Sequence, residues 1–145
     1  MTSYSEIYEI FLRNIEDEDI ANLSDNDRED VCAEYLEMAL GYLLLEDIKT
    51  SHSFEDRDDE LCEFNFEMPL REKMGLALYM VVAWYQPKVN SLEHTLMFWG
   101  SKDEKWTDQR NHWKQTCDIQ NQYRLRARKY FRNYSSRNNS YLNGE

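Results

Sequence analysis

Hydrophobic residues recur at three- and four-residue steps in the first third of the chain, a period that predicts amphipathic helices. A short helix is expected over residues 4–14, where Ser3 and Glu6 have the spacing of a capping box. A longer helix is expected over residues 25–45, with Ser24 as its N-cap and acidic residues in its first turns. The acidic run 16–19 between them is expected to be a solvated turn.

The central stretch, residues 69–90, predicts the core helix of the domain. Residues 74–85 (MGLALYMVVAWY) carry no charge, so a helix here has no face suited to water and is expected to be buried on all sides. The run is shorter than the ~20 apolar residues that a membrane span needs, which excludes a transmembrane helix. Pro87 is expected to end the helix, because proline lacks the backbone N–H and restricts the residue before it.

The last helix is expected to run from about residue 107 to about residue 134. Two series of residues seven apart lie along it, and both are only partly apolar, so the helix is predicted to pack partly on its own domain and partly on something else. The first series contains Trp106, Trp113, Gln120, Ala127 and Tyr134, and the second contains Gln109, Thr116, Tyr123 and Tyr130.

Together these patterns predict an all-α fold. We expect one domain over residues 1–134, a bundle of three to four main helices with long loops at residues 46–66 and 87–105. Residues 135–145 show no periodicity and are expected to form an extended, flexible C-terminal tail that orders on a partner. Only four glycines and two prolines are present, which argues against a turn-rich β fold.

Charge is distributed unevenly along the chain, whose net charge is −11. Residues 1–63 contain 20 acidic and 4 basic residues, a net charge of −16, whereas residues 120–145 contain one acidic and 6 basic residues, a net charge of +5. This distribution fits either an ordinary solvated surface or a protein that meets its own copies or a partner through unlike faces. An acidic protein is a poor candidate for binding nucleic acid, which requires a basic footprint.

No catalytic or metal-binding constellation is visible in the sequence. The three histidines lie outside zinc-binding motifs, and no glycine-rich phosphate loop is present. The acidic stretch around residues 55–60 lacks the alternating ligands and central glycine of a calcium loop. Three widely spaced cysteines fit buried thiols in a reduced compartment better than a disulfide framework. We therefore expect an interaction protein without a cofactor, not an enzyme.

Residues 80–134 resemble a known family. The matching pieces are residues 87–91 (PKVNS), residues 100–105 (GSKDEK) and the pair Asn111 and His112, followed by a basic, tyrosine-rich end. In this order they resemble the head–tail connector proteins, also called adaptor or neck proteins, of tailed bacteriophages. The resemblance implies a structural protein of the virion neck, made in the host cytoplasm. It also implies a ring of copies, typically twelve, beneath the portal protein, a downstream neck or tail-completion protein, and DNA that passes through without being specifically bound.

Three groups of residues are candidate contact sites within this interpretation. The portal contact is expected from the C-terminal basic and aromatic residues Arg124, Arg128, Lys129, Tyr130, Arg132, Tyr134 and Tyr141, which are otherwise a solvated helix face. A contact with a neighbouring copy or the tail side is expected from the apolar residues Met97, Phe98 and Trp99, which are otherwise a plug in the core. A loop that faces the DNA channel and repels phosphate is expected from Asp56, Asp58, Asp59 and Glu60.

A second interpretation of the same sequence is an acidic helical regulator, or DNA mimic, that binds a basic partner protein. Its support is the net charge of −16 in residues 1–63, whereas the basic end of the last helix argues against it. Steeply salt-dependent binding to basic proteins would distinguish it from the neck protein.

Overall fold

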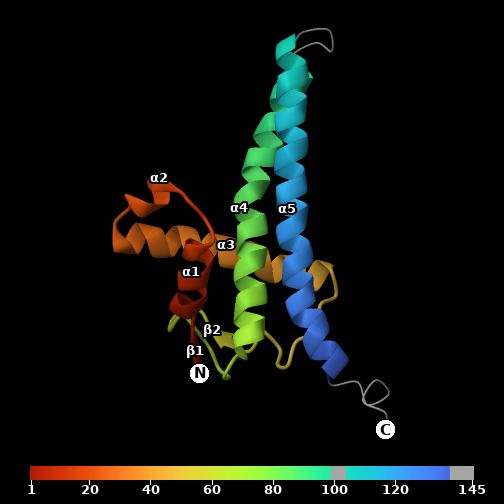
Figure 1. The fold of residues 1–145 in the computed structure, drawn as a ribbon. Helices are drawn as coiled ribbons and strands as arrows, with labels where there is room; N and C mark the ends of the chain where they lie inside the picture. The colour runs from red at the N-terminus through yellow and green to blue at the C-terminus, as the bar shows by residue number, and fades with distance from the viewer. Residues whose placement is uncertain (99–103, 138–145) are drawn as a thin grey trace.

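A computed structural model describes residues 1–98 and 104–137, and it is 73% helical, which confirms the all-α fold. The described residues form four main helices, one short helix and three short strands, and Figure 1 shows the strands near the lower end of the molecule. The helices are α1 (Tyr4–Arg13), α2 (Glu18–Ala21), α3 (Asp25–Leu45), α4 (Leu70–Phe98) and α5 (Glu104–Arg137). The strands are β1 (Thr2–Ser3), β2 (Arg57–Asp58) and β3 (Glu63–Phe64), paired antiparallel in the order β1-β3-β2.

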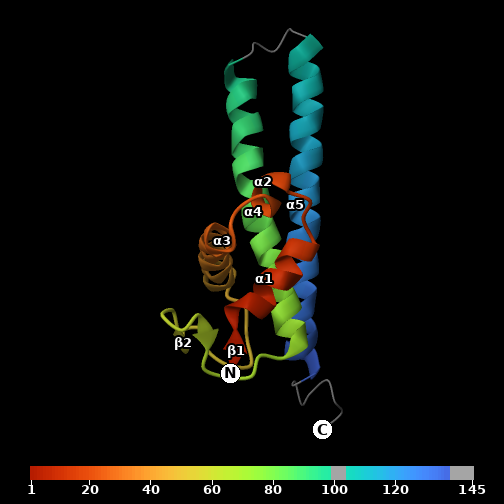
Figure 2. The same cartoon turned by 90° about the vertical axis from the view of Figure 1, so that its left-hand side faces the viewer.

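Helices α4 and α5 run side by side as a long antiparallel hairpin (Figure 1, Figure 2). The lower half of the hairpin packs against α1 and α3, and we call this part with its covering helices the body. The upper part, formed by the last turns of α4 and the first turns of α5, extends beyond α1, α2 and α3, and we call it the arm. The molecule is thus a helical body from which a two-helix arm projects.

The contact between α4 and α5 follows a heptad pattern on both helices. Trp106 donates its indole N–H to the carbonyl oxygen of Leu96 at 3.2 Å, and the rings of Tyr85 and Tyr123 stack with centroids 5.8 Å apart. The two predicted series on α5 are buried or half-buried as far as Tyr130, which confirms that the helix packs on its own domain. Its packing on something else stays a prediction. The matching residues of α4, at alternating three- and four-residue steps, are Gly75, Leu78, Val82, Tyr85, Val89, Leu92 and Leu96.

The expectation that Pro87 ends the central helix is wrong, because α4 continues to Phe98 with the proline inside it. Pro87 is exposed and removes one hydrogen bond from the helix interior. Gln120 of α5 holds this part of α4 in place, since its side-chain NH₂ group donates to the carbonyl oxygen of Val82 at 3.1 Å and to the side-chain oxygen of Gln86 at 2.7 Å. Residues 87–98 are therefore helical, not a loop, because packing on α5 outweighs the local preference of proline.

The segment between α3 and α4, residues 46–69, contains the short strands β2 and β3 and packs onto the body. Phe54, Phe64 and Phe66 are buried and contact one another, with ring centroids 5.5–5.8 Å apart. Thr2 fixes the segment to the N-terminus, since its hydroxyl donates to the carbonyl oxygen of Phe66 and accepts from the backbone N–H of Met68. The buried aromatic residues explain why an acidic segment is held in place.

The helix starts at Ser3 and Ser24 are confirmed, whereas the acidic run 16–19 is not a simple turn. Ser3 and Glu6 form the capping box of α1, and the Ser24 hydroxyl accepts from the backbone N–H of Asp27. Asp17 starts the short helix α2, because its carboxylate accepts from the backbone N–H groups of Asp19 and Ile20. This helix could not be expected from periodicity, since it is four residues long.

The Asp17 carboxylate also joins α2 to α4. Its second oxygen accepts a hydrogen bond from the indole N–H of Trp84 at 2.9 Å, and the ammonium group of Lys88 lies 4.3 Å from the centre of the same indole ring. Burial pushes the pKa of Asp17 upward, but the hydrogen bonds from Trp84 and the backbone N–H groups outweigh it and lower the pKa below its usual 3.8.

The Asp17–Trp84 contact is therefore expected to weaken only in acid. A carboxyl group whose pKa is lowered by folding contributes stability above its unfolded pKa, and this contribution is lost as the pH falls through the folded pKa. The NMR signal of the Trp84 indole N–H, assigned with Trp84→Phe, should titrate with a midpoint below 3.8. Asp17→Asn should remove this titration, and a midpoint at or above 3.8 in the unaltered chain would contradict the assignment.

Candidate functional site

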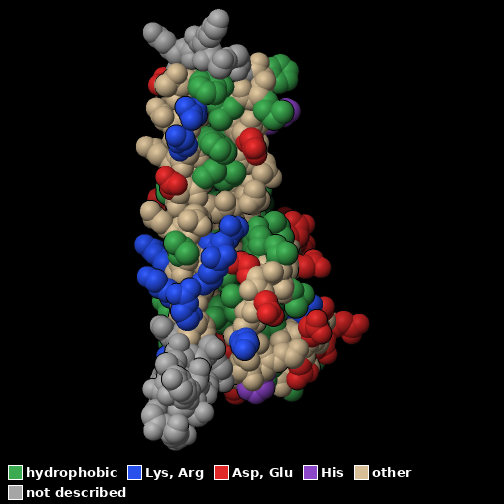
Figure 3. Space-filling view, turned by 90° about the vertical axis from the view of Figure 1, so that its right-hand side faces the viewer, with side chains coloured by type: hydrophobic (Ala, Val, Ile, Leu, Met, Phe, Trp, Pro, Cys, Tyr) green, Lys and Arg blue, Asp and Glu red, His purple; other side chains and the backbone are tan. Residues whose placement is uncertain are grey.

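Unlike charges gather on two edges of one face of the molecule. Figure 3 shows Lys and Arg side chains over the lower part of α5 and Asp and Glu side chains over the body on the opposite edge. The basic residues on this part of α5 are Arg124, Arg126, Arg128, Lys129 and Arg132. Six acidic residues along α3 are exposed, namely Asp25, Asp27, Glu29, Asp30, Glu34 and Glu37. The uneven charge along the sequence is thus also an uneven charge in space.

Two of the basic residues expected at a portal contact instead make contacts within the fold. Arg128 forms an ion pair with Glu46, just beyond the last residue of α3, where a cation also suits the helix dipole. The hydrogen bond to Glu46 raises the pKa of Arg128, and burial next to this pair raises the pKa of Tyr79 to about 12. The Arg124 guanidinium lies 5.7 Å from the centre of the Tyr42 ring. Both cations therefore fasten α5 to α3.

The other residues expected at the portal contact differ in their exposure. Lys129 and Arg132 are exposed and form no hydrogen bond or ion pair with any described residue. Tyr130 is half-buried and packs against the core. The side chain of Tyr134 and the whole of Tyr141 lie outside the described residues. Sequence alone could not separate the free cations from the engaged ones, because Glu46 and Tyr42 are distant along the chain.

The four acidic residues expected to face a DNA channel lie around the β2–β3 turn. Three of their carboxylates accept local hydrogen bonds: Asp56 from Asn65, Asp58 from the backbone N–H groups of Glu60 and Leu61, and Asp59 from Tyr4 and Arg57. The hydrogen bond from Tyr4 lowers the pKa of Asp59. Glu60 is exposed. These carboxylates hold the turn together, and their role toward DNA stays a prediction.

Two apolar residues at the end of α4 form the tip of the arm. Met97 and Phe98 are 83% and 81% exposed, so they are not a plug in the core of this chain. Trp99 lies outside the described residues. Large apolar side chains in such a position are typical of a contact with another chain.

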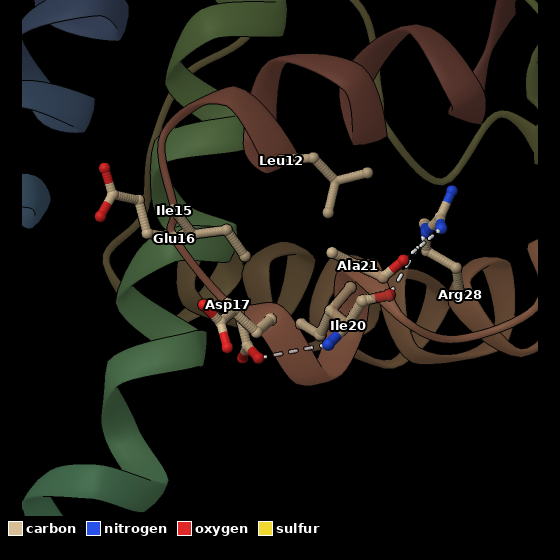
Figure 4. A pocket seen from close by; sticks show the side chains of 8 residues that line it. Leu12, Ile15, Glu16, Asp17, Ile20, Ala21 and Arg28 are labelled. Atoms are coloured by element: carbon tan, nitrogen blue, oxygen red, sulfur yellow. Dashed lines mark hydrogen bonds between the residues drawn. The ribbon is translucent and has the colours of Figure 1, made fainter.

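A groove that the sequence did not reveal lies between the end of α1, helix α2 and the start of α3, and it encloses about 790 Å³. Figure 4 shows Leu12 and Ile15 pointing into the space between the helices, with Ile20 and Ala21 opposite them. Arg28 closes one end and donates to the carbonyl oxygens of Ile20, Ala21 and Leu23.

The rim of this groove is acidic. Glu16 and Glu18 are exposed and form no hydrogen bond or ion pair with any described residue, whereas Asp17 is engaged with Trp84 and the start of α2. The available sequence signal was the pair Leu12 and Ile15, three residues apart and followed by acidic residues. To predict the groove, the position of α2 would also have to be known, and local periodicity does not predict it.

Over residues 1–98 and 104–137, no three His, Cys, Asp or Glu side chains are grouped so that they could hold a metal ion. Within the same part of the chain, no helix has the length and apolar character to cross a membrane. Cys32 is buried, Cys62 is exposed and Cys117 is half-buried, so the expectation of buried thiols holds only for Cys32. Comparisons of the chain with protein-family models, curated proteins and solved structures find no match.

Proposed function

We propose that this chain is a structural subunit of the neck of a tailed bacteriophage, a head–tail adaptor that forms a ring under the portal and extends the DNA channel toward the tail. The observation that carries the proposal is the separation of charge on one chain, with acidic residues along α3 and free cations on α5. Unlike surfaces on one molecule favour contacts between different faces of successive copies. Such heterologous contacts form a ring when the rotation between copies closes.

The described segments that carry the family resemblance belong to the α4–α5 hairpin. Residues 87–91 lie in α4 where the arm begins, and Asn111 and His112 lie in the arm on α5. Of the matching piece 100–105, residues 100–103 lie outside the described residues. In a ring, the bodies would supply the contacts between copies, and the arms with exposed Met97 and Phe98 would reach the next component of the neck.

The portal contact is proposed for the C-terminal end of α5 and the residues after it. Because Arg124 and Arg128 are engaged within the fold, the contact falls to the more C-terminal part of the expected group, with Tyr134 and Tyr141 as aromatic anchors.

Deleting residues 135–145 is expected to leave the domain folded and to abolish binding to the portal ring, because no described core residue is removed. Circular dichroism would report the fold, and co-sedimentation with the portal ring would report binding. Tyr141→Ala should weaken binding in the same assay, and Ser140→Ala is the matched control in the same segment. Full retention of portal binding by the deleted chain would refute this role.

A second candidate function is an acidic regulator that binds a basic, DNA-binding protein. The observation that favours it is the row of six exposed carboxylates along α3, which pair with no basic residue of the described part of the chain except Arg28 at Asp25. Its partner would bind with a steep salt dependence, because such contacts are screened over about 10 Å at 0.1 M salt. If portal binding survives replacement of Glu29, Glu34 and Glu37 by glutamine, the result would favour the neck protein over the acidic regulator.

A further inference from the structure

The α1–α2–α3 groove combines an apolar floor with uncompensated negative charge. Leu12, Ile15 and Ile20 form the floor, and Glu16 and Glu18 on the rim form no ion pair with a described residue. Arg28 also lines the groove, but its guanidinium is bound to backbone carbonyl oxygens and to Asp25. A segment that fits this groove presents an apolar side chain next to two cations. The chemistry therefore selects a basic amphipathic surface and not an anion, a nucleic acid or a neutral peptide.

One face of α5 has this composition. Leu125, Lys129 and Arg132 are spaced by four and three residues, so they lie along one side of the helix, and we call them the α5 docking face. Leu125 is 44% exposed, and the two cations are exposed and unpaired among the described residues. Ala127 and Tyr130, on the neighbouring side of the helix, pack against the core instead. The two cations of the docking face therefore stay available to a partner as far as the described residues are concerned.

The groove and the docking face lie on opposite sides of the molecule. In Figure 1, α2 and the start of α3 are at the left, and the lower end of α5 is at the right. Two copies related by a two-fold axis cannot make both contacts at once, because each copy would present its two surfaces in opposite directions. Successive copies instead use the groove of one and the docking face of the next, which continues the assembly beyond a dimer.

We propose that the α1–α2–α3 groove receives the α5 docking face of a second copy of this chain. Leu125 packs on the apolar floor, and Lys129 and Arg132 pair with Glu16 and Glu18. This inference deepens the proposed function, since it rests on a ring of copies and names the surfaces that join them. It also assigns Lys129 and Arg132 to the neighbouring copy instead of the portal.

Charge reversal at four exposed positions tests the contact. The groove variant, Glu16→Lys with Glu18→Lys, and the face variant, Lys129→Glu with Arg132→Glu, should each lose self-association in sedimentation velocity at low salt, because like charges then meet. The variant with all four reversals has the net charge of the original chain, and it should associate again. Glu9→Lys with Glu93→Lys, two exposed acids away from the groove and from α3, changes the net charge as the groove variant does and should leave association intact.

The unaltered chain is expected to form species larger than a dimer as its concentration rises. A chain that stays monomeric at every concentration, retained association in both double variants, or failure of the fourfold variant to recover would each overturn the proposed contact. The neck function is tested separately. Stoichiometric portal binding, with no effect of the charge reversals on self-association, would refute the groove contact and support the neck function. The expected effect of the reversals, with no portal binding, would support the groove contact and refute the neck function.

Discussion

Replacing Phe131 with alanine should lower the free energy of unfolding by about 3–5 kcal/mol, the usual loss when a buried phenylalanine leaves a cavity. Phe131 is 2% exposed where α5 crosses the start of α4, and its ring lies 6.3 Å from the ring of Tyr79 and 6.4 Å from that of Phe54. The ring lies directly on Gly75, where an added Cβ would come within 2.5 Å of a Phe131 ring carbon. Few atoms could move in to fill the space, because the surrounding residues belong to three different segments.

Urea unfolding followed by circular dichroism would measure this loss. Gln122→Ala, at an exposed position of the same helix, is the control and should change the stability by less than about 0.5 kcal/mol. Gly75→Ala should destabilise the unaltered chain by overpacking, but it should be tolerated on the Phe131→Ala background, where the ring is gone. Equal losses from Gly75→Ala on both backgrounds would show that the two residues are not in contact.

Replacing Arg128 with methionine should lower the free energy of unfolding by about 2–3 kcal/mol. Removing one partner of a buried ion pair leaves the other charge uncompensated, which costs about 3–5 kcal/mol when both groups are fully buried. The side chains of Arg128 and Glu46 are 37% and 14% exposed, so solvent reduces the loss. The second oxygen of the Glu46 carboxylate already has no hydrogen-bond partner, so without Arg128 this carboxylate would be nearly isolated.

A double-mutant cycle separates the ion pair from the packing of the arginine stem. Glu46→Leu combined with Arg128→Met should recover most of the loss, because the isolated carboxylate is removed together with its partner. Arg126→Met, an exposed cation two residues away, is the matched control for the loss of one positive charge. If the double variant is as unstable as the sum of the two single variants, the pair does not hold α3 to α5.

The sequence predicted the elements that depend on local pattern. The capping residues Ser3 and Ser24 and the heptad series of α5 could be identified because each is defined by spacing over a few residues. The prediction that Pro87 ends the central helix is wrong, because the local effect of proline is smaller than the stabilisation from seven α4 residues that pack on α5. The hydrogen bond from Gln120 adds to this packing. Helix α2 depends on Asp17 and its hydrogen bond to Trp84, a contact 67 residues apart that no local pattern reveals.

The candidate surfaces were predictable in their charge but not in their partners. The basic end of α5 is visible in the sequence, whereas the division between engaged Arg128 and free Lys129 depends on where Glu46 lies in the fold. The groove forms from three helices and could not be predicted, although Leu12 and Ile15 contribute the apolar pair that begins it. Contacts between residues that are far apart in the sequence could thus not be predicted from the sequence pattern.

The measurement that tests the proposed function most directly is co-sedimentation of the purified chain with its cognate portal ring, with the number of bound copies read from the mass of the complex. A head–tail adaptor predicts a stoichiometric complex with one copy per portal subunit, which is lost when residues 135–145 are deleted. A chain that sediments alone in the presence of the portal ring would contradict the neck function and favour the acidic regulator.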